Sequence, residues 1–411
     1  MAFQFGLGIA VARFLGASGS GIYSIYTSWF NLLSNVMALG LPQLCTRKVS
    51  ILFSQNNSDH IRKFAYFSFK IFAGISIPVV IVFYILNPHI ASIFADGEEQ
   101  GYILKLSAIA ASAFIFLKFT SEMLRAMNKL NTAMAIESLT LPFLLTSAVY
   151  VIYLLPIEDK PTYFLITHIS FLFFLSGVSW LLCNHQLNKI QKQSAHLADS
   201  EFSAPAKNTL FTFWLSSTLG IWFLNMPLLI APIFSDLHDT GIFSAAYRLI
   251  TVIVNVMMVL SGVYGPKFAR GFNEKNYQLV WADLKKTGRI SFAMFIPLFV
   301  AFFAVPEQIL SMFGPDFAAG ADWLRIMAVG QLIYSATGLV GLALNMMHQE
   351  RLEMILMFIS ASVMLILMLV LGNFYDITGI AIGFAFGLTF KNTVSLFFAR
   401  KLLKNLISPS S

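Results

Sequence analysis

Charged residues are scarce in this sequence of 411 residues, making up 11% of it, whereas hydrophobic residues make up 57%. Soluble globular proteins carry about 25% charged residues, so this composition excludes an ordinary soluble domain. Cysteine is scarcer still, and Cys45 and Cys183 lie too far apart to form a metal or redox motif. Together these shortages exclude a disordered chain and a disulfide-stabilised scaffold.

Catalytic motifs are also missing. The sequence has no Walker A loop, no HExxH and no GxSxG, and its seven histidines never adopt metal-ligand spacing. No connection between the apolar runs is long enough to fold into a catalytic domain. We therefore predict that the protein is not an enzyme and uses no cofactor and no metal. We expect no nucleic-acid partner either, because no soluble basic domain exists to present such a surface.

Long apolar runs are what the sequence has in abundance. A helix that crosses a bilayer needs about 20 mostly apolar residues. Runs of this kind fall near residues 1–14, 21–44, 64–87, 101–124, 133–155, 162–183, 208–234, 241–265, 289–305, 321–346, 352–371 and 377–399. We predict an all-α polytopic membrane protein with about twelve transmembrane helices.

Basic residues are distributed unevenly over the connections between these runs. The connections after the even-numbered runs, together with the C-terminal tail, hold most of the lysines and arginines, whereas the alternate connections are acidic. Because cytoplasmic loops collect lysine and arginine, we predict that both termini lie in the cytoplasm. The net charge of +7 follows from this asymmetry.

The two halves of the sequence repeat at a separation of 220 residues. Gly21–Ser24 returns as Gly241–Ser244, and Asn35–Met37 returns as Asn255–Met257. Further matches follow in the same order, including prolines and a basic residue. Resemblance by composition alone is the alternative, but it does not explain an ordered series.

The duplication predicts how the chain is organised. We expect two pseudo-symmetric six-helix bundles, residues 1–185 and 208–411, joined by a cytoplasmic linker at 186–207. Each half holds six spans, an even number, so both insert with the same orientation. Like-oriented repeats related by an axis along the membrane normal enclose a cavity between them, which is a transporter architecture.

A few cations fall inside the predicted spans, where a charge costs about 2.5–3.5 kcal/mol at a helix centre. We predict that five of them line the cavity and bind a phosphate-bearing ligand: Arg13, Lys105, Arg248, Arg325 and Lys391. Arginine supplies bidentate hydrogen bonds to phosphate, and lysine supplies a point charge. The alternative is that the outer cations reach the membrane interface and pair there with acids such as Asp239 or Asp322.

Charged residues also gather at the predicted inner ends of the spans. The basic residues that we expect at an inner gate are Arg47, Lys48, Lys118, Arg125, Lys267 and Arg270. Glu122 and Glu137 are placed to take up a coupling ion from the inner side. Lys118, Glu122 and Arg125 share one helix face, so structural ion pairing is the alternative for Glu122.

Several short segments resemble a known family. They are Val11-Ala12-Arg13-Phe14-Leu15-Gly16 followed by Gly21-Ile22-Tyr23-Ser24, then Gly40-Leu41-Pro42 with Thr46-Arg47-Lys48, and finally Leu124-Arg125-Ala126-Met127-Asn128-Lys129. With them the chain resembles, over essentially its whole length, the Wzx-type polysaccharide (O-antigen) flippases of the MATE-like MOP exporter superfamily. The resemblance implies two six-helix bundles that alternate access, and Arg13 matches the family's common arginine.

The family's function is the expectation that follows. Such a flippase translocates undecaprenyl-pyrophosphate-linked oligosaccharide across the bacterial inner membrane for O-antigen, capsule or exopolysaccharide synthesis. Its partners would be membrane lipids, a coupling H⁺ or Na⁺ and other polysaccharide assembly proteins. One alternative is a MATE-type multidrug or cation antiporter, which typically needs an acid in the first helix, and residues 1–14 contain none. A membrane-embedded polysaccharide polymerase is disfavoured by the short outer loops.

Overall fold

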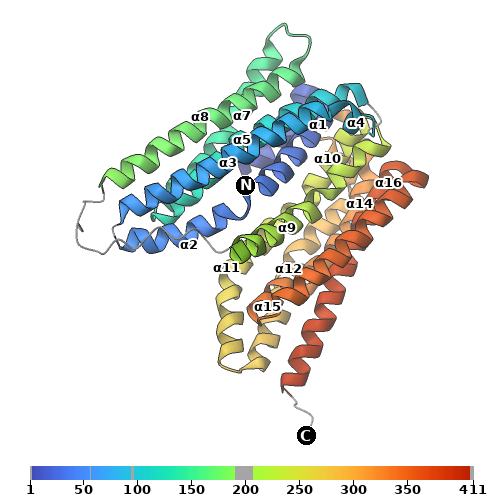
Figure 1. The fold of residues 1–411 in the computed structure, drawn as a ribbon. Coiled ribbons are helices and arrows are strands. Elements are labelled where there is room, and N and C mark those ends of the chain that lie inside the picture. The colour runs from blue at the N-terminus through green and yellow to red at the C-terminus, as the bar shows by residue number, and fades with distance from the viewer. Residues whose placement is uncertain (1, 56, 94–96, 190–206, 408–411) are drawn as a thin grey trace. The chain divides into compact units, whose positions relative to one another are not determined.

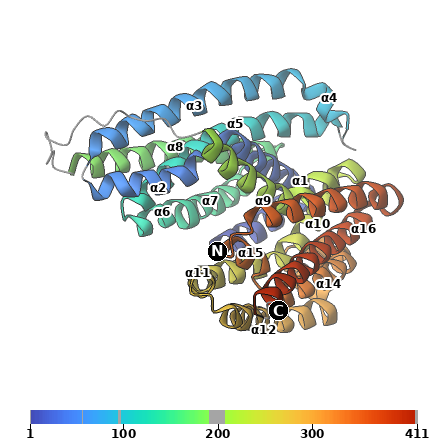
Figure 2. The ribbon, with the colours of Figure 1, turned by 60° about the horizontal axis from the view of Figure 1, so that its bottom comes forward.

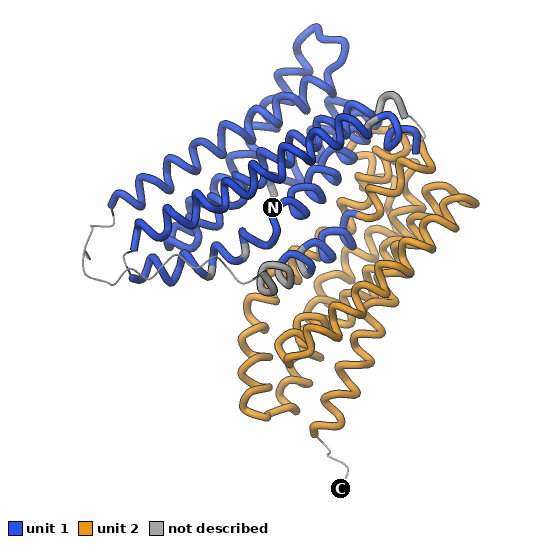
Figure 3. Tube along the Cα trace, in the orientation of Figure 1, with its two compact units in different colours: residues 1–225 blue, residues 226–411 orange. Residues whose placement is uncertain are grey.

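The structure, a computed structural model, describes residues 2–55, 57–93, 97–189 and 207–407. Every regular element in these ranges is a helix, and they contain no strand (Figure 1). The prediction of an all-α fold is therefore confirmed. The chain divides into two compact units, residues 1–225 and 226–411, which are described separately below (Figure 3). The division falls inside a helix, and most of the predicted linker lies outside the described residues.

The helices follow one another with short connections. The first unit contains α1 (Ala2–Ala38), α2 (Leu41–Ser54), α3 (Ser58–Ile85), α4 (Asn87–Ala91), α5 (Gly97–Ala126), α6 (Leu130–Ala135), the π-helix η1 (Ile136–Thr140), α7 (Leu141–Leu154) and α8 (Lys160–Lys189). Helix α9 (Lys207–Phe234) spans the division. The second unit continues with α10 (Leu237–Ile250), α11 (Val252–Asn273), α12 (Tyr277–Ala304), α13 (Pro306–Leu310), the 3₁₀-helix η2 (Pro315–Gly320), α14 (Ala321–Thr337), α15 (Val340–Met346) and α16 (Glu350–Ile407).

Nine helices in the described ranges are long and apolar enough to cross a membrane. Two of them are bent: α1 at Gly16, where φ is 73°, and α16 at Tyr375 and Asp376. Helix α9 adds a shorter apolar stretch, Thr218–Phe234. Counting both arms of the bent helices and this stretch, the described chain has twelve apolar helical segments, which agrees with the predicted number.

The duplication is visible in backbone detail. The side chains of Asn57 and Asn276 cap α3 and α12, and each accepts a backbone N–H three residues later at 3.1 Å. Asn128 and His348 stand 220 residues apart, and both adopt a left-handed conformation, with φ of 60° and 59°. At both of these turns, one helix therefore ends and the next begins in the same way in the two units.

Helix α5 is the centre of the first unit, where it packs against α1, α2, α3 and α8. Figure 2 shows α3 running alongside it. Small buried side chains allow this close approach: Ser107 of α5 donates to the Tyr26 carbonyl at 3.2 Å, and Ser176 of α8 donates to the Ala113 carbonyl at 3.1 Å. The neighbours therefore hold α5, and the charges at its end, in place.

Helix α14 occupies the corresponding position in the second unit and packs against α12 and α16. The two arms of α16 approach each other through glycines, and a Cβ on Gly387 would lie 2.5 Å from the Met364 Cβ. Unlike α5, the α14–α15 segment is broken at Gly338, where φ is 65°. A Cβ there would lie 2.6 Å from the Gly288 nitrogen, so glycine is required on both counts.

Candidate functional site

Four charged residues meet at the C-terminal end of α5, and we call them the unit 1 cluster: Lys118, Glu122, Arg125 and Glu137. The Arg125 guanidinium pairs with Glu122 through one nitrogen and with Glu137 through another. The Thr46 hydroxyl on α2 donates to the Glu122 carboxylate at 2.8 Å, and the Lys118 ammonium donates to the Asn35 side-chain oxygen on α1 at 3.1 Å. The cluster therefore connects α1, α2, α5 and η1.

Local backbone features bring these side chains together. Arg125 lies in the last turn of α5, where its positive charge is favourable beside the negative end of the helix dipole. The left-handed turn at Asn128 then reverses the chain, so that Glu137 returns to the level of Arg125. Glu137 sits in the π turn, in which the Leu141 N–H bonds to the Ile136 carbonyl five residues earlier. Pro142 has no N–H to donate within the helix, which accounts for the irregular turn just before it.

The unit 1 cluster is partly open. The side chains of Glu122, Glu137 and Arg125 are 18%, 22% and 28% exposed. Two carboxylates share the Arg125 guanidinium, while the Lys118 ammonium donates to Asn35 rather than to either acid. A proton or a small cation that reaches either acid would therefore compete with Arg125 for it, which is the chemistry required of a coupling site.

A second ion pair lies within the other unit, and we call Glu353 and Lys391 the unit 2 pair. The Lys391 ammonium lies 2.6 Å from a Glu353 carboxylate oxygen, and the Ser395 hydroxyl donates to the other oxygen at 3.1 Å. Their side chains are only 11% and 8% exposed. The backbone of Gly341 covers the pair, since a Cβ there would lie 3.0 Å from the ammonium.

Glu353 was not predicted from the sequence. It stands at the start of a helix after a polar turn, and its partner follows 38 residues later in the chain, so no local spacing connects them. A signal did exist, because a lysine inside an apolar run requires an acidic or polar partner. Since the ammonium of Lys391 is engaged within unit 2, its predicted role in lining a cavity would require this pair to break.

The other predicted cavity cations reach the surface of their own units. Arg13 on α1 is exposed, and Arg248 on α10 is half-buried. The Lys105 ammonium lies 4.7 Å from the ring centre of Tyr84 on α3. Arg325 pairs with Asp322 at 2.8 Å, as the alternative interpretation expected for this residue. Their role in binding a ligand stays a prediction.

The predicted inner-gate residues outside the cluster are also spread over both units. Lys48 on α2 lies 5.5 Å from the ring centre of Phe64, and burial lowers the pKa of its ammonium from the ordinary value. Lys267 and Arg270 are exposed on α11. The side chain of Arg47 lies outside the described residues. A gating role for these residues stays a prediction.

Metal-ligating side chains come together once in the part of the chain that the structure describes. Ligand atoms of Asp236, His238 and Asp239 lie within 4.8 Å of one another. Asp236 caps α10 by accepting the Asp239 N–H at 2.8 Å, so helix capping explains the group without a metal. His168, by contrast, is buried with its ring 5.4 Å from that of Tyr26, which is a packing environment.

Neither a protein-family profile nor a curated protein sequence matches the chain. Solved structures do. A multidrug resistance MATE family transporter of the MOP superfamily, in its inward-facing conformation, matches with a TM-score of 0.72 at 13% identity, covering 100% of this chain and 96% of that one. The lipid II flippase MurJ, in an inward closed conformation, matches with a TM-score of 0.68 at 14% identity, covering 99% and 87%. A MOP superfamily transporter from Pyrococcus furiosus, described as having a binding pocket of reverse polarity, matches at 0.65 and 14%, covering 99% and 92%.

These matches define the class of fold. The chain has the polytopic, all-helical fold of the MOP superfamily transporters along essentially its whole length. The predicted MATE-like fold is therefore confirmed. Because the identities are 13–14%, the likeness concerns the fold, and the same fold serves both a multidrug transporter and a lipid flippase.

Proposed function

We propose that this protein is a flippase for polyprenyl-pyrophosphate-linked oligosaccharides, acting in surface polysaccharide synthesis. It would work in the inner membrane of a bacterium, with both termini in the cytoplasm, and would alternate access between the two leaflets. Undecaprenyl pyrophosphate is the carrier that the resemblance to Wzx-type proteins implies. The fold is compatible with a lipid-linked substrate, because a lipid II flippase shares it over 99% of this chain.

The observation that carries this proposal is the sign of the charges in the outer half of the spans. The first arm of α1 holds Arg13 and no acid, and Lys105, Arg248 and Arg325 are further cations that we predict within about two turns of the outer ends of their spans. A pyrophosphate pays a large desolvation cost in hydrocarbon unless fixed cations replace its water. Cationic drugs would gain nothing from such groups. The charge pattern therefore favours an anionic headgroup.

The unit 1 cluster supplies the coupling step in this proposal. Glu137 or Glu122 would bind H⁺ or Na⁺ from an aqueous space while Arg125 stays with the other acid. Binding at one acid changes which residues Arg125 connects, and hence how α5 is held against α2 and η1. In this way an ion gradient could drive the change of access without an ATP site.

A leaflet assay in proteoliposomes tests the flippase proposal directly. The probe is a fluorescent polyprenyl-pyrophosphate disaccharide whose movement between leaflets is followed by quenching. We expect Arg13→Ala, Lys105→Ala, Arg248→Ala and Arg325→Ala each to slow translocation at least tenfold, because each removes a charge that compensates the pyrophosphate. Lys401→Ala, an exposed cation near the C-terminus, is the matched control. Wild-type rates in all four variants would refute the cation lining.

A MATE-type multidrug antiporter is the second candidate, favoured by the TM-score of 0.72 with a multidrug transporter. It predicts efflux of cationic dyes from loaded proteoliposomes under an H⁺ or Na⁺ gradient. The flippase proposal predicts no such efflux. Dye efflux without movement of the lipid-linked disaccharide would replace the flippase proposal by the antiporter.

A further inference from the structure

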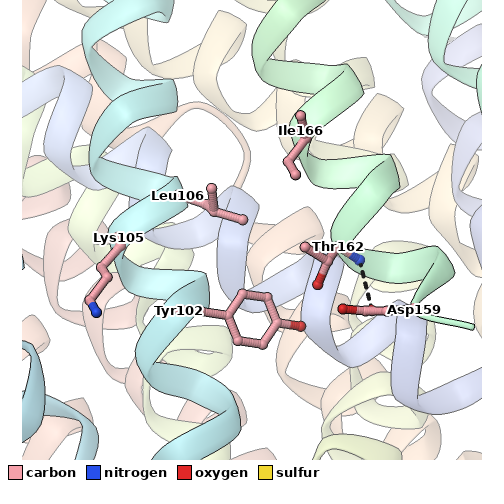
Figure 4. A pocket seen from close by; sticks show the side chains of 6 residues that line it. All are labelled: Tyr102, Lys105, Leu106, Asp159, Thr162 and Ile166. Atoms are coloured by element: carbon pink, nitrogen blue, oxygen red, sulfur yellow. Dashed lines mark hydrogen bonds between the residues drawn. The ribbon is translucent and has the colours of Figure 1, made fainter.

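A pocket of about 290 Å³ opens on the surface of unit 1 between α5 and α8 (Figure 4). It is lined by Tyr102, Lys105, Leu106, Asp159, Thr162 and Ile166. The unit 1 cluster lies toward the other end of α5, roughly 30 Å away at 1.5 Å per residue. The pocket is thus separate from the proposed coupling site at the C-terminal end of α5.

The acid in this pocket has no counter-charge. Asp159 is exposed, and its carboxylate accepts the backbone N–H of Thr162 at 3.2 Å, which caps α8. Lys105 also lines the pocket, but its ammonium lies over the ring of Tyr84, and Lys160, next to Asp159 in the chain, donates to the Tyr153 carbonyl at 3.0 Å. Among the described residues, none forms an ion pair with Asp159. The Asp159 carboxylate is therefore available to a cationic ligand.

A hydroxyl beside this acid is also unsatisfied. The Thr162 Oγ1 atom is buried and has no hydrogen-bond partner in the described part of the protein. Figure 4 shows the Thr162 side chain directed into the space between α5 and α8, next to the Tyr102 ring. Leaving a buried hydroxyl unpaired is unfavourable, and a ligand with an N–H donor would remove that cost.

The other end of the pocket is apolar. Leu106 and Ile166 each follow Tyr102 and Thr162 by four residues, which places them about 6 Å further along their helices. Ile166 is 46% exposed, so its side chain faces the surroundings of the protein rather than its core. The surface therefore changes from charge to hydrocarbon within about one helical turn, as the membrane interface itself does.

We propose that this pocket binds a phospholipid whose headgroup carries a primary amine. The ammonium donates to the Asp159 carboxylate and to the Thr162 hydroxyl. The acyl chain then lies along Leu106 and Ile166. The inference rests on Asp159 and Thr162, neither of which takes part in the proposed transport of the substrate, although Lys105 belongs to both sites.

Native mass spectrometry of the purified protein tests the proposal with three lipids of identical acyl chains: phosphatidylethanolamine, phosphatidylcholine and phosphatidylglycerol. Phosphatidylcholine keeps the positive charge but has no N–H donor, and phosphatidylglycerol has no cation. We expect the wild type to retain phosphatidylethanolamine at least fivefold better than either other lipid. Equal retention of all three lipids would overturn the proposal.

Asp159→Asn is the decisive variant, because its amide oxygen can still cap α8 while the charge is removed. We expect it to lower phosphatidylethanolamine retention to the level of phosphatidylcholine, and Thr162→Val to lower it by a smaller factor. Glu158→Gln, the adjacent exposed acid that does not line the pocket, is the matched control. Unchanged retention in Asp159→Asn, or an equal loss in Glu158→Gln, would refute the site. An unchanged melting temperature in detergent verifies that each variant is folded.

Discussion

The two units solve the problem of intramembrane charge differently. In unit 1, two acids share one guanidinium, and the three side chains are 18–28% exposed. In unit 2, one acid and one ammonium pair alone, at 8% and 11% exposure, with a glycine backbone against them. With Lys118 counted, the unit 1 cluster holds two acids and two cations, so both arrangements balance their charges and neutrality does not distinguish them.

The difference lies in what each arrangement can exchange. The unit 2 pair has a single partner for each charge and almost no access to water, so breaking it strands a buried ion. The unit 1 cluster has a cation that can stay with either of two acids, and its side chains are partly exposed. In our proposal, the unit 2 pair is structural and the unit 1 cluster serves ion coupling.

The largest effect that we expect comes from removing one member of the sealed pair. Lys391→Met leaves the Glu353 carboxylate buried without a counter-ion, and such losses cost about 3–5 kcal/mol of folding free energy. Thermal unfolding in detergent, followed by fluorescence, measures the change. The double variant Glu353→Leu with Lys391→Met is expected to recover most of this stability and to retain transport. If the double variant were stable but inactive, the unit 2 pair would have a role in transport, and the proposed difference between the two units would be wrong.

The broken helix of unit 2 gives the next largest effect. Gly338→Ala places a Cβ 2.7 Å from the Thr287 hydroxyl at a residue with φ of 65°, and we expect a loss of about 1–3 kcal/mol. Gly262→Ala is the control, since no atom lies within 4 Å of its new Cβ. That change should be neutral or stabilise the helix by up to about 1 kcal/mol. Equal melting temperatures for the two variants would contradict the proposed strain at residue 338.

Neutralising an acid of the open cluster should affect transport more than stability. Glu137→Gln keeps a hydrogen-bonding side chain beside Arg125 but cannot release a proton, so we expect translocation driven by a pH gradient to fall about tenfold, which corresponds to about 1.4 kcal/mol. The translocation rate of this variant should also no longer depend on the pH gradient. The same measurement on Glu122→Gln shows which of the two acids binds the coupling proton. If both variants retained gradient-driven transport, coupling by this cluster would be excluded.

The smallest effects should be equal in the two units. Asn57→Ala and Asn276→Ala each remove a cap from equivalent helices, and each should lower stability by about 1 kcal/mol. Asn57→Asp and Asn276→Asp, which preserve the caps, are the controls. If the melting temperature fell by clearly different amounts in the two alanine variants, the equivalent caps would contribute different free energies of folding in the two units.

The sequence was sufficient to predict the helices, their number and the repeat, because apolar runs and matched turn residues are local signals. The pairing of charges was only partly predictable. Glu122 and Arg125 lie three residues apart on one helix, so their contact follows from spacing. Glu353 and Lys391 meet only because the two arms of α16 pack closely through glycines, and that approach is a property of the folded unit.

The break at Gly338 shows the same limit. The repeat aligns this residue with Lys118, which lies in the unbroken helix α5. Composition presents both positions as parts of similar apolar spans. What distinguishes them is contact with the Thr287 hydroxyl and the Gly288 backbone of a neighbouring helix, which only tertiary packing creates.

The π turn that carries Glu137 is a place where the helix of the first unit can change its rotation about its own axis. A π turn accommodates one residue more than an α-helical turn, and passing that residue along the chain rotates the side chains on one side of it by about 100° relative to the other. A rotation of that size at residues 136–140 would swing the carboxylate off the guanidinium without unfolding α7. Capture and release of an ion could then be converted into a twist of the helix itself.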